Sequence, residues 1–154
     1  MHRLLMLLTL LLTPGFARAS DAVSLSSEVF VEKTVTGDDG KTRILLDQPK
    51  LVMPGDNLVF VLKYRNASAE PAANFSVTNP LPAAVSFRDT GGEKALYSVD
   101  GGRNWGMIST LKIRERTGRL RSARPDDVTH VRWTFRQPLP AGATGKLTFR
   151  GTVR

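Results

Sequence analysis

Short runs of alternating apolar and polar residues, each adjoining a proline-containing corner, recur along most of this chain. The clearest runs cover residues 58–65, 75–79 and 131–135. Period-two runs with such boundaries are typical of β-strands, and many short strands at this spacing are typical of a β-sandwich. No helical period persists over a long window beyond residue 19. The sequence therefore predicts an all-β fold, a single antiparallel β-sandwich.

The first 19 residues have a different character. A basic start with Arg3 leads into an apolar stretch over residues 4–12, which is too short to cross a bilayer as a helix. A Pro-Gly break follows, and Ala17 and Ala19 are small residues at the two positions that a signal peptidase reads. We expect residues 1–19 to be a cleaved signal peptide that directs the chain to the periplasm, the cell envelope or the medium. An uncleaved membrane anchor is the alternative.

Composition limits what the exported part can be. Cleavage after Ala19 leaves 135 residues, enough for one domain with a hydrophobic core, and the absence of cysteine excludes a disulfide scaffold. We expect a flexible lead-in at residues 20–28 and one domain over residues 29–154. No transmembrane segment is expected after the signal, because the longest later apolar run, residues 58–62, has only the length of a strand.

The net charge points to a class of partner. It is +8 for the whole chain, and removal of Arg3 and Arg18 with the signal leaves +6. In an exported protein such a charge favours anionic envelope polymers over nucleic acid, although it also promotes solubility.

The alternation predicts which faces of the strands form the core. Residues 58–64 place Leu58, Phe60 and Leu62 on one side, which we expect to be buried, while Val59 and Val61 lie on the other. The first strand, at residues 29–35, is expected at the edge of a sheet. The last two, at residues 130–135 and 146–153, are expected to be antiparallel neighbours in one sheet.

The order of the turns carries a family resemblance. Pro54-Gly55-Asp56 precedes an aromatic-alternating strand, Asn66 follows it, and the runs 71–77, 79–82, 97–102 and 139–142 come next. This order resembles the bacterial and archaeal conserved surface repeat known as domain of unknown function eleven, over residues 29–154. The resemblance implies an immunoglobulin-like β-sandwich on exported or envelope proteins, without assigned catalysis. The chain carries one copy where the family often forms arrays, which argues against a stalk or spacer role.

Residues 98–105, Ser-Val-Asp-Gly-Gly-Arg-Asn-Trp, also resemble an Asp-box, the S-x-D-x-G-x-x-W hairpin of sialidases and other glycan-active propellers. Its aspartate can accept N–H groups across the turn, its glycines allow positive φ, and its tryptophan packs beneath. Such hairpins are scaffold in those enzymes and recur in several blades, whereas this short chain has one. We therefore expect a structural turn built by Ser98, Asp100, Gly102 and Trp105. A small glycan-active enzyme is the alternative.

The residue inventory gives little support to catalysis or to a cofactor. The one histidine beyond the signal, His130, lies on the outward side of its strand, and no nucleophile elbow accompanies it. The acid pairs Asp38-Asp39 and Asp126-Asp127 lack the spaced acidic neighbours of a dedicated calcium loop. We expect no catalytic residue, metal ligand or cofactor, and solvated turns at both acid pairs. Calcium at either pair stays open.

Residues 112–124 are the most biased stretch, with six cations and one acid around a turn at Thr117-Gly118. No aromatic residue interleaves with the charges, so base stacking is not indicated. A charged hairpin that prevents edge pairing is one interpretation. Contact with an anionic polymer, such as lipopolysaccharide or an acidic polysaccharide, is the sharper one. The candidate contact residues are Lys112, Arg114, Arg116, Arg119, Arg121 and Arg124.

These observations favour an exported, envelope-associated binding or structural module without catalytic activity. Its expected partners are an envelope protein or an anionic envelope polymer. Besides the glycan-active enzyme, a pilus-type subunit or chaperone that acts by strand complementation is an alternative.

Overall fold

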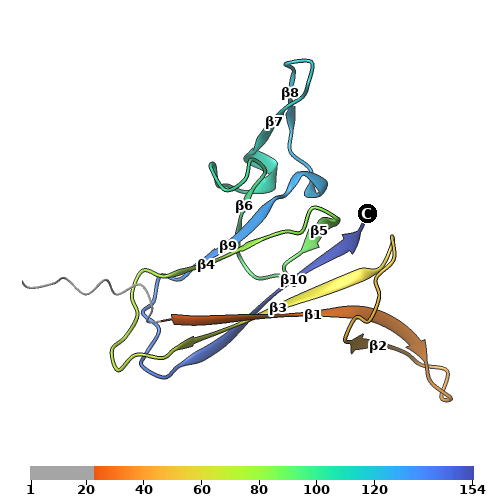
Figure 1. The fold of residues 1–154 in the computed structure, drawn as a ribbon, viewed down its shortest axis with the longest axis horizontal. Coiled ribbons are helices and arrows are strands. Elements are labelled where there is room, and N and C mark those ends of the chain that lie inside the picture. Colours follow the sequence, from red (N-terminus) through yellow and green to blue (C-terminus); the bar gives the residue numbers. More distant parts are fainter. Residues whose placement is uncertain (1–22) are drawn as a thin grey trace, which may run out of the picture.

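Two antiparallel sheets and a separate two-stranded hairpin make up residues 23–154, the part of the chain that this computed structural model describes (Figure 1). The signal peptide predicted at residues 1–19 and the start of the predicted lead-in lie outside the described residues. The predicted all-β fold of antiparallel sheets is confirmed, and the arrangement is consistent with the predicted β-sandwich.

The larger sheet has the order β2-β1-β3-β10-β5 and the smaller one the order β4-β9-β6, while β7 and β8 form the hairpin. Two single 3-10 turns, η1 (Ile108–Thr110) and η2 (Pro125–Asp127), flank the hairpin. Among residues 23–154, no helix is long and apolar enough to span a membrane. The strands are β1 (Val23–Thr36), β2 (Thr42–Asp47), β3 (Asn57–Asn66), β4 (Ser76–Pro80), β5 (Val85–Asp89), β6 (Leu96–Ser98), β7 (Lys112–Arg114), β8 (Leu120–Ser122), β9 (His130–Thr134) and β10 (Thr144–Val153).

The core lies between the two sheets and includes Leu58, Phe60 and Leu62, the predicted face of β3. Phe60 of β3 lies opposite Phe149 of β10, and their rings stack with centroids 4.4 Å apart. Trp133 of β9 reaches the same cluster from the smaller sheet, with its ring centroid 6.3 Å from that of Phe149. Other buried members of this cluster are Leu58, Leu62, Val77, Val85, Phe87, Tyr97, Val131 and Leu147.

The second face of β3 is also buried, which the alternation did not predict. Val59 is 2% exposed and Val61 is 8% exposed, although they face away from the core. Because β3 is the central strand, long side chains of its neighbours can cover this face. Lys63 and Glu28 form an ion pair of 2.7 Å there, and Arg150 of β10 pairs with Glu32 and Asp89.

Strand β1 differs from the prediction in length and position. It begins at Val23, so residues 23–28 of the predicted lead-in belong to a strand. Its first half, up to Val31, pairs with β3, and its second half, from Val31, pairs with β2. The predicted edge position is therefore wrong for the strand as a whole, although each half pairs on one side only. The small polar residues at the start of β1 concealed the strand from pattern analysis.

Strands β9 and β10 are not neighbours, contrary to the prediction. β9 lies between β4 and β6 in the smaller sheet, and β10 lies between β3 and β5 in the larger one. The connection between them crosses from one sheet to the other. It is held by Asn66, which is fully buried and donates to the carbonyl oxygens of Leu139 (2.9 Å) and Glu70 (2.7 Å). A proline-rich connection can thus resemble a hairpin loop in sequence even where it joins strands of two different sheets.

Two ribbons extend beyond the sandwich (Figure 1). The first is the β7–β8 hairpin. The second, which we call the arm, comprises residues 31–47, that is, the second half of β1 together with β2. All six residues of β2 are exposed.

Candidate functional site

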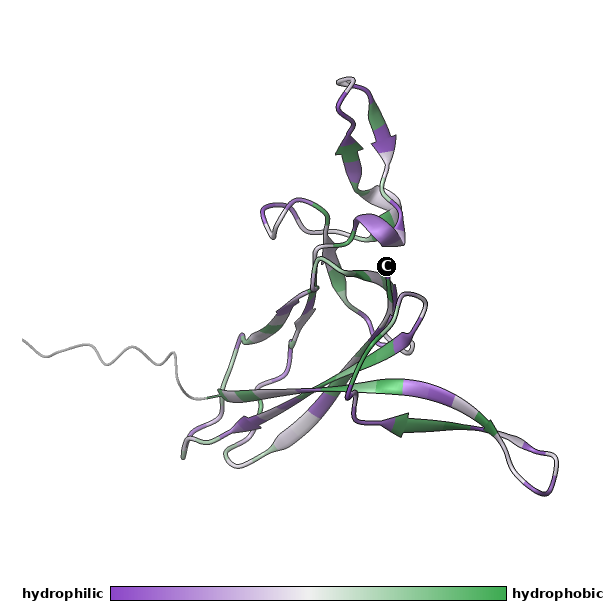
Figure 2. Cartoon of the chain, turned by 45° about the vertical axis from the view of Figure 1, so that its right-hand side comes forward, coloured by the Kyte–Doolittle hydropathy of each residue, from purple (hydrophilic) through white to green (hydrophobic). Residues whose placement is uncertain are grey.

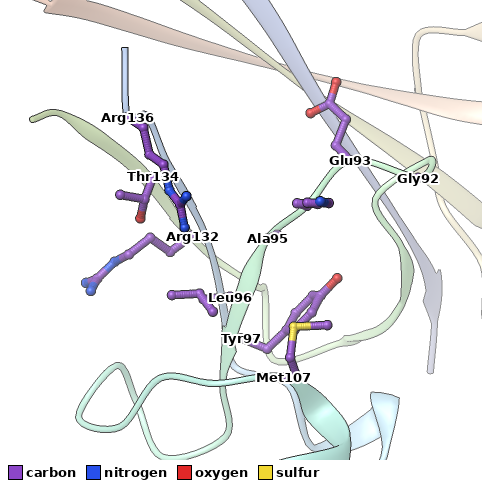
Figure 3. A pocket seen from close by; sticks show the side chains of 10 residues that line it. Gly92, Glu93, Ala95, Leu96, Tyr97, Met107, Arg132, Thr134 and Arg136 are labelled. Carbon is purple, nitrogen blue, oxygen red and sulfur yellow. The ribbon is translucent and has the colours of Figure 1, made fainter. Parts of the chain in front are cut away.

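A groove of about 1000 Å³ opens along β6, the short edge strand of the smaller sheet (Figure 3). Residues of the segment before β6, of β9 and of the turn before η1 surround it. Its lining residues are Gly92, Glu93, Lys94, Ala95, Leu96, Tyr97, Met107, Arg132, Thr134 and Arg136.

The groove combines cationic and apolar groups. Lys94, Arg132 and Arg136 come from separate positions along the chain, and Glu93 is the one acid in the lining. Leu96 and Met107 supply exposed apolar surface, with exposed fractions of 38% and 54%. A groove of this composition can hold a group that carries negative charge on one side and apolar surface on the other.

Arg132 is fixed in place by two neighbours. Its Nε donates to Oγ1 of Thr78 on β4 over 2.9 Å, and its guanidinium carbon lies 3.7 Å from the ring centroid of Trp105. The planar guanidinium thus stacks on an aromatic ring, an arrangement that keeps its charge available at small entropic cost. Arg132 is a pre-positioned cation in the wall of the groove.

The Asp-box-like turn holds Trp105 against Arg132. Asp100 Oδ1 accepts hydrogen bonds from the backbone N–H groups of Arg103 (3.1 Å) and Asn104 (3.0 Å) and from the hydroxyl of Ser98 (2.8 Å). Gly102 adopts a φ of +88° and its carbonyl accepts from Trp105 Nε1 over 2.9 Å. These bonds match the hydrogen-bonding geometry expected of Ser98, Asp100, Gly102 and Trp105. Trp105 is half-buried and lies beside Arg132 and His130.

The same bonds leave Asp100 unsuited to proton transfer. Hydrogen bonds from the backbone and side chain of Asn104, and from Ser98, hold the pKa of Asp100 far below its usual range. Ser98 lies opposite His130 in the strand register, but it is fully buried and its hydroxyl donates to Asp100. His130 Nδ1 instead contacts Oγ1 of Thr129 at 3.1 Å. The geometry is that of a turn that positions side chains, and it does not resemble a catalytic triad.

One acid of each pair considered for calcium is engaged by a cation. Asp39 forms an ion pair of 2.6 Å with Arg43. Asp127 accepts two hydrogen bonds from Arg121, of 2.6 and 2.7 Å, and one from the backbone N–H of Arg124, so its pKa lies below the usual range chiefly because of Arg121. Asp127 is therefore a half-buried anchor and not the solvated residue that was expected. Within residues 23–154, no three potential metal ligands converge.

The structure separates the six predicted cations of residues 112–124 into two groups. Arg121 is committed to Asp127 and also lies 3.3 Å from Glu115, so it fixes the base of the hairpin. Arg114 and Lys112 donate to Gly118 and Ser122 within the hairpin, yet both stay exposed. The exposed cations are Lys112, Arg114, Arg116, Arg119 and Arg124.

The groove cations were missed from the sequence. Arg132 and Arg136 share the outward side of the run whose inward residues include Val131 and Trp133, so the alternation could have placed them together. Lys94 comes from another segment, and only the fold brings it to the same groove.

No family model matches this sequence, and searches among curated proteins and among solved structures likewise find no match. The resemblance to the surface repeat therefore stays a prediction.

Proposed function

We propose that this chain is an exported, envelope-associated binding module without catalytic activity that holds an anionic polymer in the groove along β6. The observation that carries the proposal is the convergence of Lys94, Arg132 and Arg136 on exposed apolar surface. An acidic polysaccharide offers the complementary pattern, because its sugar rings have apolar faces and its substituents are charged.

The charges of the groove are available to a ligand. Lys94 and Arg136 are exposed and take part in no ion pair within residues 23–154. Arg132 is stacked on Trp105 and bonded to a neutral hydroxyl, so its charge is not neutralised. Cations free of internal partners raise the local potential and attract an anion.

The hairpin extends this basic surface. Met107 lines the groove, and the chain runs from it through η1 directly into β7. A polymer longer than the groove can therefore meet Arg114, Arg116 and Arg119 on the hairpin. The sequence features at residues 1–19 and the resemblance to an envelope repeat support an exported location for this module.

Binding to an acidic polysaccharide, polygalacturonate, tests the proposal. The double variant Lys94→Gln/Arg136→Gln should weaken binding at least tenfold, and Lys41→Gln/Arg65→Gln, which removes the same charges elsewhere on the surface, should leave it within about twofold. Binding of the unaltered protein should also weaken steeply above physiological salt, where the Debye length is about 8 Å. Equal losses in the two variants, or binding that does not respond to salt, would contradict a site in the groove.

A second comparison assigns the role of the hairpin. The triple variant Arg114→Gln/Arg116→Gln/Arg119→Gln should weaken binding to long polymer and leave binding of a single galacturonate trimer unchanged. The matched control is Lys41→Gln/Lys50→Gln/Arg65→Gln, which changes the net charge equally. If the trimer is lost as well, the hairpin and not the groove is the primary contact.

A further inference from the structure

The outer edge of β2 is open, and no charge or proline interrupts its centre. β2 ends the order of the larger sheet and pairs, within residues 23–154, with β1 alone. Its centre consists of three consecutive aliphatic residues, Ile44, Leu45 and Leu46, with exposed fractions of 62%, 52% and 51%. In Figure 2 this strand is a hydrophobic segment on a ribbon that extends away from the body. An open edge of this kind is a template for a further strand.

Charges or a proline interrupt three other sheet edges within residues 23–154. β5 carries Arg88 and Asp89, and its pairing with β10 is irregular next to Arg150. β4 ends in Pro80, which cannot donate to a strand. The opposite edge of the arm, on β1, carries Glu32 and Lys33. None of these three edges has three consecutive exposed aliphatic residues, as β2 does.

We propose that two copies of this chain join through β2, antiparallel and edge to edge, around a two-fold axis at Leu45. In this register Leu45 lies opposite Leu45 of the second copy, and Ile44 lies opposite Leu46. Arg43 then lies opposite Asp47 of the second copy, at both ends of the strand. The six-residue strand is thus complementary to itself in both apolar character and charge.

Only this register has both properties. Because side chains alternate between the two faces of a strand, a two-fold pairing can shift only in steps of two residues. A step in one direction places Arg43 opposite Leu45, and a step in the other places Asp47 opposite Leu45. Either shift leaves one aliphatic pair where the register centred on Leu45 has three.

The internal ion pairs of the arm fit the proposed contact. Asp47 is bonded to Lys33 at 2.8 Å and Arg43 to Asp39 at 2.6 Å, and all four side chains are exposed. Bringing Asp47 of one copy to Arg43 of the other produces a row of alternating charges at each end of β2. No like charges face each other.

The dimer is weak by itself but matters for a polymer ligand. Pairing of one short strand buries less than the roughly 1600 Å² of a standard interface, so we expect a dissociation constant on the order of 0.1 mM. The two larger sheets would become one continuous sheet. Each dimer would carry two grooves, which would raise its avidity for a polymer; this consequence alone rests on the proposed function.

Complementary charge variants test the proposed register. Sedimentation equilibrium of protein expressed from the full-length sequence should show a reversible dimer, measured without any polymer. Arg43→Asp and Asp47→Arg should each be monomeric, because each places like charges opposite one another. An equimolar mixture of the two variants should dimerise again, because acidic ends then face basic ends. This rescue cannot arise from misfolded variants.

Matched controls exclude general charge attraction. A mixture of Arg65→Asp and Glu70→Arg, at exposed positions outside the arm, should behave like the unaltered protein. Leu45→Lys should abolish the dimer, whereas Leu51→Lys, at an aliphatic residue 79% exposed outside β2, should not. A protein that stays monomeric up to about 1 mM, ten times the expected constant, would overturn the proposal, and so would a mixture that fails to dimerise.

Discussion

The two ribbons that leave the sandwich have similar architecture and opposite surfaces. The β7–β8 hairpin carries four exposed cations, whereas the arm ends in a strand with three exposed aliphatic residues. A two-stranded ribbon is only marginally stable alone, so each needs support from the rest of the molecule. The hairpin takes it from the Arg121–Asp127 ion pair at its base, and the arm takes it from β1, which continues into the larger sheet.

This difference separates two uses of an exposed ribbon. Repulsion between cations keeps the hairpin from pairing with other strands while leaving it free to meet an anionic polymer. The arm lacks such a barrier at β2, where exposed aliphatic side chains favour contact with another protein surface. We therefore expect both ribbons to depend on the same sandwich core for stability, while their surfaces act independently.

The largest effect on stability is expected in the sandwich core, which supports both ribbons. Phe149 is fully buried and stacks on Phe60, so Phe149→Ala should lower the free energy of unfolding by about 3–5 kcal/mol. Urea denaturation followed by tryptophan fluorescence measures this. The control is Leu120→Ala on the hairpin, 56% exposed, which should change stability by less than about 0.5 kcal/mol. Similar effects of the two changes would mean that the sandwich core does not dominate stability.

A smaller effect is expected where the hairpin is anchored. Asp127→Ala removes the bidentate partner of Arg121 and the acceptor for the N–H of Arg124, and it should cost about 1–2 kcal/mol. Its neighbour provides the control, since Asp126 is exposed and its side chain accepts no hydrogen bond within residues 23–154; Asp126→Ala should be neutral. Hydrogen exchange should also speed up in β7 and β8 but not in β2. Equal loss from both alanine variants would mean that the ion pair does not anchor the hairpin.

Sequence patterns predicted the strands more reliably than their neighbours. The alternation at residues 58–64 placed Phe60 and Leu62 in the core correctly because that pattern depends on local geometry alone. The separation of β9 from β10 was not predictable, since it depends on which sheet each strand joins. The exposure of residues Ile44 to Leu46 could not be predicted for the same reason. Three consecutive aliphatic residues usually indicate a strand buried on both faces, and only the sheet order shows that β2 is at an edge.

The candidate site was predictable to a similar degree. The turn at Ser98 to Trp105 followed from its motif, because its hydrogen bonds close within eight residues. The pairing of Arg121 with Asp127 was hidden in a run of apparently equivalent cations. The groove could not be predicted in full, because Lys94 lies far from β9 along the chain and no local pattern links the two.

Acid should weaken the side of the molecule that carries the groove. The pKa of Asp100 is lowered in the folded state, chiefly by hydrogen bonds from Asn104. The stability that its carboxylate contributes is thus complete above the ordinary pKa of about 4 and is lost as the pH falls toward the lowered value. Asp100→Asn should show a shallower loss of stability below pH 4 than the unaltered protein. Acid titration of unfolding midpoints measures this, and identical slopes would contradict the role of Asp100 in the turn.

The smallest effect is expected in the arm, and it tests the comparison most directly. Ile44→Thr and Leu46→Thr each introduce a β-branched side chain that is compatible with a strand. Both positions are more than half exposed in the monomer. At about 1 µM protein, where the proposed dimer is dissociated, each change should alter the free energy of unfolding by less than about 0.5 kcal/mol. At 0.5 mM the same changes should lower the apparent stability relative to the unaltered protein, because mass action then favours the folded dimer. A cost above about 1.5 kcal/mol at 1 µM would show that these side chains pack within the monomer. The arm would then resemble the core, and its exposed strand would no longer differ in kind from the hairpin.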